Sequence, residues 1–144
     1  MRIAICDDDP SASSAIEEIV SSCFQADSTR FECEVFSGAE EMLREVALNP
    51  LAFQVYLLDM EMEDMTGLAA GTIIRKNDPN DEIIFATGHQ KVMTEAFDVW
   101  AFHYLVKPLD AEKTRQVLLR CIRRIEQKQS IFRFAARKST VSLY

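Results

Sequence analysis

The chain has 144 residues, a hydrophobic fraction of 48% and a formal charge of −7 from 23 acidic and 16 basic side chains. This length suits one domain with a substantial core, and the low content of glycine and proline, four of each, excludes collagen-like and low-complexity chains. No apolar run approaches the roughly 18 residues that a membrane span needs, and the acidic residues near the start of the sequence lead us to expect no secretory signal. We therefore expect a cytoplasmic protein with no membrane partner.

Five short apolar runs predict strands, and helical spacing of apolar residues follows each run. The strands are expected at residues 2–6, 31–36, 53–58, 82–86 and 102–106. The helices are expected at residues 10–23, 38–48, 65–75, 91–99 and 111–125, with Asp9 and Asp110 as caps of the first and the last. Strict alternation predicts an α/β fold of three layers, a doubly wound five-stranded parallel sheet in the flavodoxin-like order 2-1-3-4-5.

The pattern changes after Gln129, where two short strands are expected at residues 131–135 and 140–144. A single hairpin is not stable alone, so we interpret this segment as the opening piece of another domain. The charge also changes along the chain. From Lys107 onward ten basic residues stand against three acidic ones, whereas six stand against twenty before it. An acidic body and a basic tail are therefore expected, although a basic helix face is more often solvated than bound to nucleic acid.

Polar side chains follow several of the predicted strands, at the edge where ligands bind in open parallel sheets. They are Asp7, Asp8 and Asp9 after the first strand, Asp59 after the third, Thr87 after the fourth and Lys107 after the fifth. Converging carboxylates need a neutralising cation, and an all-oxygen set without histidine or cysteine selects a hard ion such as Mg²⁺.

The chemistry expected at this edge is transfer of a phosphoryl group to a carboxylate. The chain has no phosphate-binding glycine loop of the nucleotide-binding types. An aspartate can itself accept a phosphoryl group while Mg²⁺ and a lysine offset the charge. Asp59 stands alone at the end of the central strand and is the best placed acceptor.

These motifs together resemble the receiver domains of bacterial two-component response regulators, over residues 2–127. The resemblance is carried by Ile3-Ala4-Ile5-Cys6-Asp7-Asp8-Asp9, Leu57-Leu58-Asp59-Met60, Met65-Thr66-Gly67-Leu68, Ile84-Phe85-Ala86-Thr87 and Tyr104-Leu105-Val106-Lys107-Pro108. It implies that Asp59 accepts phosphate from a histidine kinase, that Asp8 and Asp59 bind Mg²⁺ directly, and that Asp7 does so through water. It also implies a metal contact from the backbone carbonyl of Glu61.

The resemblance further implies a switch. Thr87 and Lys107 would hold the phosphoryl oxygens, Lys107-Pro108 would be a cis peptide, and Tyr104 would turn inward as Thr87 moves toward the phosphate. The face formed by the helix at 91–99, the strand at 102–106 and the helix after Asp110 would then form a homodimer. Residues 1–127 would be the receiver, and residues 128–144 a linker and the truncated start of a LytTR-type DNA-binding domain, so that DNA is bound only through the missing output domain.

Several alternatives stay open at this point. A haloacid-dehalogenase-like phosphatase also uses an aspartyl-phosphate, and Asp7 and Asp9 supply its D-x-D spacing, but Lys107-Pro108 stands where that family needs a late acidic pair. A degenerate receiver that signals without phosphate is the second alternative. It is kept open because the chain departs from the family pattern at Glu63, Asp64, Thr66, Gly88 and Trp100. Tyr104 is equally well explained as a core residue, because aromatic residues favour strands. We expect a phosphoacceptor rather than an enzyme.

Overall fold

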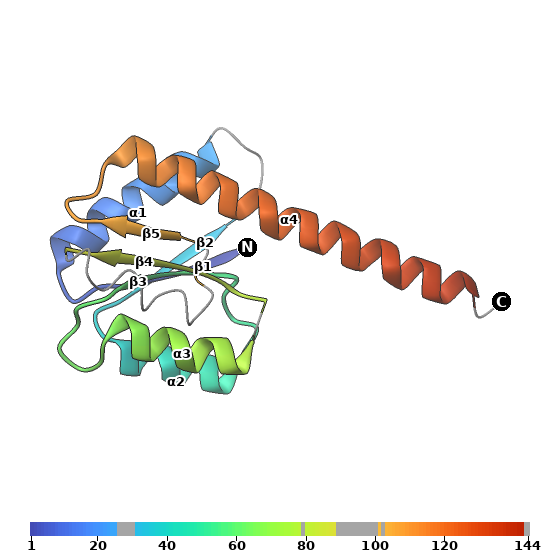
Figure 1. Ribbon diagram of the computed structural model, residues 1–144, viewed down its shortest axis with the longest axis horizontal. Helices are drawn as coiled ribbons and strands as arrows, with labels where there is room; N and C mark the ends of the chain where they lie inside the picture. The colour runs from blue at the N-terminus through green and yellow to red at the C-terminus, as the bar shows by residue number, and fades with distance from the viewer. Residues whose placement is uncertain (26–30, 79, 89–100, 102, 143–144) are drawn as a thin grey trace.

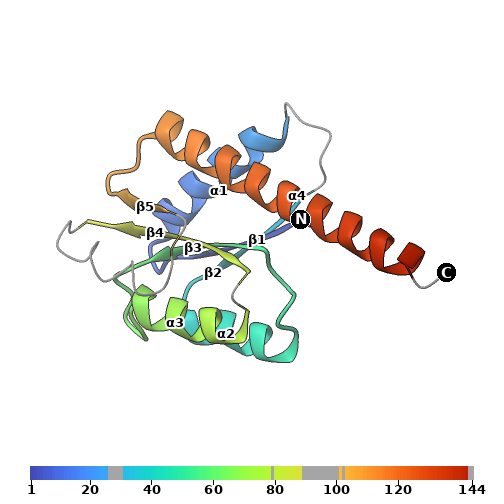
Figure 2. The ribbon, with the colours of Figure 1, turned by 45° about the vertical axis from the view of Figure 1, so that its right-hand side comes forward.

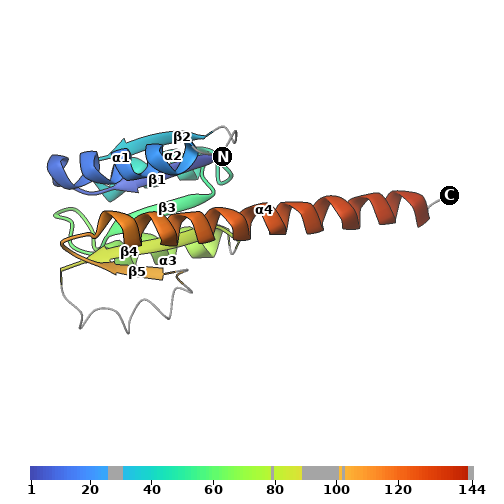
Figure 3. The ribbon, with the colours of Figure 1, turned by 90° about the horizontal axis from the view of Figure 1, so that it is seen from above.

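The fold is a parallel β-sheet between two layers of helices, as a computed structural model shows (Figure 1). The structure describes residues 1–25, 31–78, 80–88, 101 and 103–142. The five strands pair in the order β2-β1-β3-β4-β5, all parallel, and Figure 3 shows them in this order from above. They are β1 Arg2–Cys6, β2 Glu32–Phe36, β3 Val55–Asp59, β4 Glu82–Thr87 and β5 His103–Val106. The predicted strand order is confirmed.

Four helices among the described residues cover the two faces of the sheet. They are α1 Pro10–Gln25, α2 Ala39–Leu48, α3 Gly67–Asn77 and α4 Ala111–Ser142. Figure 2 shows α1 and α4 on one face and α2 with α3 on the other. None of these helices is long and apolar enough to cross a membrane. The helix expected at residues 91–99 lies outside the described residues, and so does the part of the expected dimer face that this helix would form.

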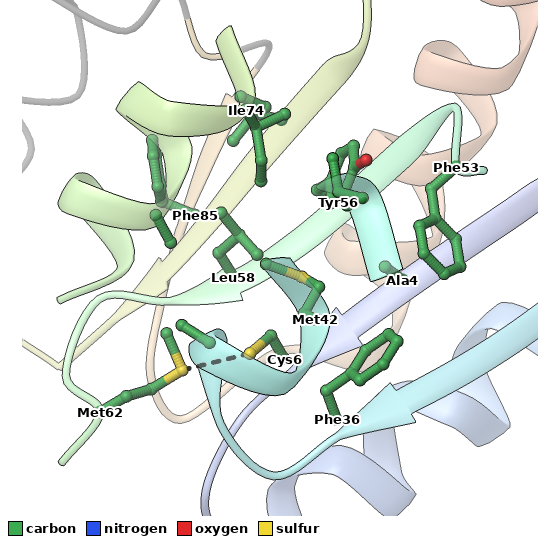
Figure 4. Packing of buried hydrophobic residues seen from close by; sticks show 14 of the residues in the cluster. Ala4, Cys6, Phe36, Met42, Phe53, Tyr56, Leu58, Met62, Ile74 and Phe85 are labelled. Atoms are coloured by element: carbon green, nitrogen blue, oxygen red, sulfur yellow. Dashed lines mark hydrogen bonds between the residues drawn. The ribbon is translucent and has the colours of Figure 1, made fainter. Parts of the chain in front are cut away.

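Each face of the sheet buries its own hydrophobic cluster because successive side chains of a strand point to opposite sides. Ile3 and Ile5 of β1 pack with α1 and α4, whereas Ala4 and Cys6 pack with α2 and α3. Figure 4 shows the second cluster, where the Cys6 thiol donates a hydrogen bond of 3.4 Å to Met62 Sδ. The sheet is therefore buried on both faces, as parallel sheets require. The ends of its strands remain available for a site.

The side-chain caps predicted at Asp9 and Asp110 are present, and Thr66 supplies a cap that was not predicted. Asp9 Oδ1 accepts the Ser11 N–H at 3.0 Å, and Asp110 Oδ1 accepts the Lys113 N–H at 2.9 Å. Thr66 caps α3 by accepting the Ala69 N–H at 3.1 Å. Each cap satisfies one of the backbone donors that a helix start leaves without a partner.

The two strands expected after Gln129 are wrong, because α4 continues as one helix to Ser142. No glycine or proline interrupts residues 127–142, and glutamine, arginine, lysine and alanine favour helices there. Extending an existing helix also avoids the cost of nucleation. The alternation of apolar and polar residues was misleading: Ile131 and Phe134, three residues apart, are 69% and 61% exposed on a helix beyond the sheet. The expected boundary at residue 127 falls within this helix.

A buried carboxylate holds α4 at the point where it leaves the sheet. The Glu82 side chain, at the start of β4, is only 4% exposed. Its Oε1 lies 2.6 Å from Lys128 Nζ and 3.2 Å from Arg124 Nε. These two cations are one helical turn apart and both half-exposed. We call this cluster of Glu82, Arg124 and Lys128 the α4 clamp.

Removing both cations of the α4 clamp should destabilise the fold more than the two single changes added together. Arg124→Ala with Lys128→Ala leaves the buried Glu82 carboxylate without both of its ion-pair partners, which costs about 3–5 kcal/mol. Each single change keeps one counter-charge and should cost about 1 kcal/mol. Urea unfolding measures all three variants, with the exposed Arg123→Ala as the matched control on the same helix. Strict additivity of the two single changes would contradict the shared role of the two cations.

Candidate functional site: an acidic pocket at the carboxyl edge of the sheet

Three aspartates meet at the carboxyl edge of the two central strands. Asp7 directly follows β1, and Asp59 is the last residue of the adjacent strand β3. Both carboxylates are buried, with exposed fractions of 3% and 6%, whereas Asp8 is exposed. Single carboxylate oxygens of Asp7, Asp8 and Asp59 all lie within 4.8 Å of one another. The predicted convergence of these three side chains is confirmed.

A lysine from the edge strand reaches across to both buried carboxylates. Lys107 Nζ lies 3.1 Å from Asp7 Oδ2 and 3.3 Å from Asp59 Oδ1. The Lys107 backbone N–H donates to the Thr87 carbonyl at 2.8 Å, which places the residue at the end of the β4–β5 ladder. The Lys107-Pro108 peptide is cis, as the resemblance implied. One ammonium thus offsets two carboxylates that come from different strands.

The electrostatics of the pocket show that its negative charge is only partly compensated. Burial raises the pKa of the Asp59 carboxyl, and the Asp7 charge raises it further, against the opposing effects of the Glu61 N–H and of Lys107. Burial disfavours the Lys107 ammonium, but its hydrogen bonds and charge contacts with Asp7 and Asp59 raise the pKa of the lysine overall. A pocket with uncompensated negative charge favours the binding of a further cation.

The residue types of the pocket fit a hard divalent cation. Among the residues that the structure describes, the converging ligand atoms are carboxylate oxygens, without histidine or cysteine, from Asp7, Asp8 and Asp59. Oxygen ligands of this number suit Mg²⁺, which keeps several waters and prefers one or two carboxylates. The exposed carboxylate of Asp8 leaves the pocket open to solvent on one side.

The loop after Asp59, residues 60–66, folds back over the pocket. The Glu61 N–H donates to Asp59 Oδ1 at 3.2 Å, and the Glu63 N–H donates to Asp8 Oδ2 at 3.2 Å. At the base of the loop, the Gly67 N–H donates to the Met60 carbonyl at 3.1 Å. Two of the three pocket carboxylates are therefore oriented by amides of this one loop.

The remaining residues expected at the site lie on β4, β5 and this loop. Thr87 ends β4, and its hydroxyl lies 3.5 Å from Glu61 Oε1. Tyr104 pairs with Phe85 across the β4–β5 ladder. Its half-buried ring packs against the cluster with α2 and α3 and stacks on His103, with 5.7 Å between ring centroids. The packing of Tyr104 agrees with the core interpretation and leaves its switch role a prediction.

Sequence reasoning missed two features of the pocket. It assigned Lys107 to a phosphoryl group, whereas the structure also pairs its ammonium directly with Asp7 and Asp59. It also gave Asp64 only as a departure from the family pattern, whereas Asp64 Oδ2 accepts the Glu40 N–H at 2.9 Å. One sequence signal could have found the second contact: α2 starts after Gly38, which has no side chain to cap it.

Comparisons with known proteins point in one direction. A family model described as the response regulator receiver domain matches residues 3–119. The sensory transduction protein LytR of Staphylococcus epidermidis is 30% identical over 118 residues, 82% of this chain and 44% of that protein. Accessory gene regulator protein A of Staphylococcus aureus is 28% identical over 121 residues, 82% of this chain and 51% of that protein. The chain spans about half the length of the curated relatives it matches.

Solved structures agree on the fold. A response regulator receiver domain protein from Clostridium thermocellum superposes with a TM-score of 0.75 at 25% identity, over 88% of this chain and 97% of that one. The receiver domain of a LuxO repressor protein from Vibrio parahaemolyticus superposes with a TM-score of 0.76 over 90% of this chain and 95% of that one. Its identity is 17%, so it supports the fold alone.

Gly67 should be irreplaceable at the base of the loop. A Cβ at this position would lie 2.3 Å from the Asp59 carbonyl oxygen and 2.9 Å from the Met60 Cα, both backbone atoms that cannot move aside cheaply. We expect Gly67→Ala to lower the free energy of unfolding by about 1–3 kcal/mol or more. Gly88→Ala is the matched control, because a Cβ there meets none of the described residues within 4 Å. Equal urea midpoints for the two variants would contradict the close approach.

Proposed function

Because the chain belongs to the response regulator receiver domains of two-component systems, we propose that it is a phosphoacceptor whose Asp59 is phosphorylated by a histidine kinase with Mg²⁺. The observation that carries this proposal is the convergence of Asp7, Asp8 and Asp59 with the Lys107 ammonium at one edge of the sheet. The chain matches the receiver portion of longer relatives. It is a signalling module and not a classical enzyme.

The proposed reaction transfers a phosphoryl group to an oxygen of Asp59. The phosphorus–nitrogen bond of a phosphohistidine breaks, a phosphorus–oxygen bond to the carboxylate forms, and the released histidine nitrogen takes up a proton. When Mg²⁺ is bound, it offsets negative charge on the transferred group. Lys107 remains beside Asp59 and compensates the charge of the phosphoryl oxygens. The Glu61 N–H, which donates to Asp59 Oδ1, keeps the carboxylate in one orientation.

The other residues take the roles that the family resemblance assigns. Asp8 and Asp59 hold the metal directly, Asp7 holds it through water, and the Glu61 backbone carbonyl completes the protein ligands. Support comes from the position of these residues around one pocket and from the loop amides that orient Asp8 and Asp59. The Thr87 hydroxyl, now near the Glu61 carboxylate, is proposed to turn to a phosphoryl oxygen.

We further propose that the chain is the receiver part of a cytoplasmic transcription regulator. Residues 128–144 are proposed as the linker to a LytTR-type output domain, through which alone DNA is bound. Support comes from the length of the relatives, which is about twice the matched region, and from the continuous helix α4 that leads away from the sheet (Figure 1). A degenerate, phosphate-independent receiver is the alternative that the unusual residues of loop 60–66 keep open.

Phosphorylation is tested with the intact chain, Mg²⁺ and acetyl phosphate as a small phosphodonor. We expect the mass of the protein to rise by one phosphoryl group, because Lys107 and Mg²⁺ together neutralise the growing charge at Asp59. Asp59→Asn should abolish the adduct, and removal of Mg²⁺ with EDTA should suppress it. Asp9→Asn is the matched control from the acidic triplet: it keeps the cap of α1 and should be phosphorylated like the wild type.

The other outcomes of this experiment identify the alternatives. A wild-type chain that gains no phosphoryl group would be a degenerate receiver. Continuous release of phosphate from phosphate esters, dependent on Asp7, would indicate a haloacid-dehalogenase-like phosphatase. Either result would overturn the proposed function.

Tyr104 should couple phosphorylation to dimer formation if it is the switch residue. We expect Tyr104→Ala to weaken the phosphorylation-dependent homodimer about tenfold, because the side chain that couples the movement of Thr87 to the dimer face would be lost. Tyr104→Phe keeps the ring and its packing and should retain most of the effect. Sedimentation with and without acetyl phosphate measures the association. Unchanged dimerisation in Tyr104→Ala together with lower stability would leave Tyr104 as a core residue.

A further inference from the structure

The start of α2 lacks a cap of its own. Its N-terminal residue outside the helix is Gly38, which makes no side-chain hydrogen bond. The backbone donors of the first turn therefore need an acceptor from another part of the chain. Asp64, which is 24 residues further along, supplies it: Asp64 Oδ2 accepts the Glu40 N–H at 2.9 Å.

Further observations indicate that the local structure accommodates and stabilises the contact between Asp64 and α2. A Cβ at position 38 would lie 2.9 Å from Asp64 Oδ2, so glycine leaves the room that the carboxylate occupies. Gly38 has an extended backbone that any residue can adopt, and space is therefore the reason for glycine. The amides of Glu40 and Ala39, with those of Asp64 and Met65, hold the pKa of the Asp64 carboxyl below its usual value. The ionised carboxylate, which accepts these hydrogen bonds, is thus the favoured form of Asp64 at neutral pH.

Asp64 stands at the tip of loop 60–66, next to the residue that contacts the pocket. The neighbouring Glu63 N–H donates to Asp8 Oδ2. At the other end of the loop, Gly67 closes onto Met60. The loop is thus held at its base by a backbone hydrogen bond of its own and at its tip by the hydrogen bond between Asp64 and α2. The tip is the part that orients the most exposed of the three pocket carboxylates.

We propose that Asp64 is a positioning residue that fastens loop 60–66 to the N-terminus of α2 and so keeps the Glu63 amide and the Glu61 backbone at the acidic pocket. Asp64 does not touch the pocket carboxylates in this role and acts through the loop. Contacts of this kind, one step removed from the ligands, commonly change metal affinity. The effect on Mg²⁺ rests on the proposed function, whereas the effect on the loop does not.

Three variants separate the possible causes. Asp64→Ala removes both the acceptor and the charge. Asp64→Asn removes the charge and keeps an oxygen that can cap a helix. Thr66→Ala removes a cap of comparable strength from the same loop, but that cap belongs to α3 and does not connect the loop to α2. The pattern across these variants distinguishes a specific fastening from loss of charge and from general loosening.

Amide hydrogen exchange of the metal-free full chain is the first readout. We expect the Glu63 amide to exchange about tenfold faster in Asp64→Ala, because the contact that holds the loop tip is lost. Asp64→Asn and Thr66→Ala should stay close to the wild type at Glu63. Unchanged exchange in Asp64→Ala, or equally fast exchange in Thr66→Ala, would overturn the proposal.

Titration with Mg²⁺ by calorimetry is the second readout. We expect Asp64→Ala to weaken Mg²⁺ binding about tenfold, Asp64→Asn to restore most of it, and Thr66→Ala to leave it unchanged. If Asp64→Asn binds as weakly as Asp64→Ala, charge alone explains the effect and the positioning role is wrong. A wild-type chain that binds no Mg²⁺ would contradict the proposed function, while amide exchange would still decide the role of Asp64.

Discussion

The ammonium of Lys107 between two buried carboxylates is the interaction on which the whole carboxyl edge depends. Asp7 and Asp59 are held at the ends of adjacent strands, where the register of β1 and β3 pairs Cys6 with Leu58. Without a counter-charge, two buried carboxylates at this distance would repel each other and shift toward the protonated form. Lys107 directly follows β5 and Asp7 directly follows β1, so the four strands from β1 to β5 in the order β1-β3-β4-β5 are needed to bring the charges together. The site is therefore a property of the tertiary fold and not of one motif.

The sequence predicted much of this arrangement because the physical signals are short-range. Alternation of apolar runs with helical spacing located the strands, and chemistry at the strand ends located Asp7, Asp59 and Lys107. The caps at Asp9 and Asp110 were also readable, because a cap and its helix are adjacent in sequence. The predicted positions of the strands, the caps and the charged side chains agree with the structure. The roles of Thr87, Glu61 and Tyr104 in signalling remain predictions.

What the sequence did not reveal depends on contacts between distant segments or on competition between local preferences. The cap that Asp64 gives to α2 joins residues 24 positions apart, and nothing in the local pattern names its partner. After Gln129 the apolar residues suggested strands by alternation, but a helix already formed by α4 can be extended at little cost. Local alternation over five residues therefore failed where the preceding helix decided the outcome.

The α4 clamp fixes one point of the long helix to the sheet, and the residues after this point extend beyond it. Glu82 forms ion pairs with Arg124 and Lys128 of α4. The strand that begins at Glu82, β4, ends at Thr87 beside the pocket. Beyond Lys128 the helix continues to Ser142 on the side away from the strand arrowheads (Figures 1 and 3). At 1.5 Å per residue this arm is about 20 Å long, so a tilt of about 10° at its anchor moves its far end by about 4 Å. An arm of this length converts a small change of angle at the sheet into a larger displacement at its far end.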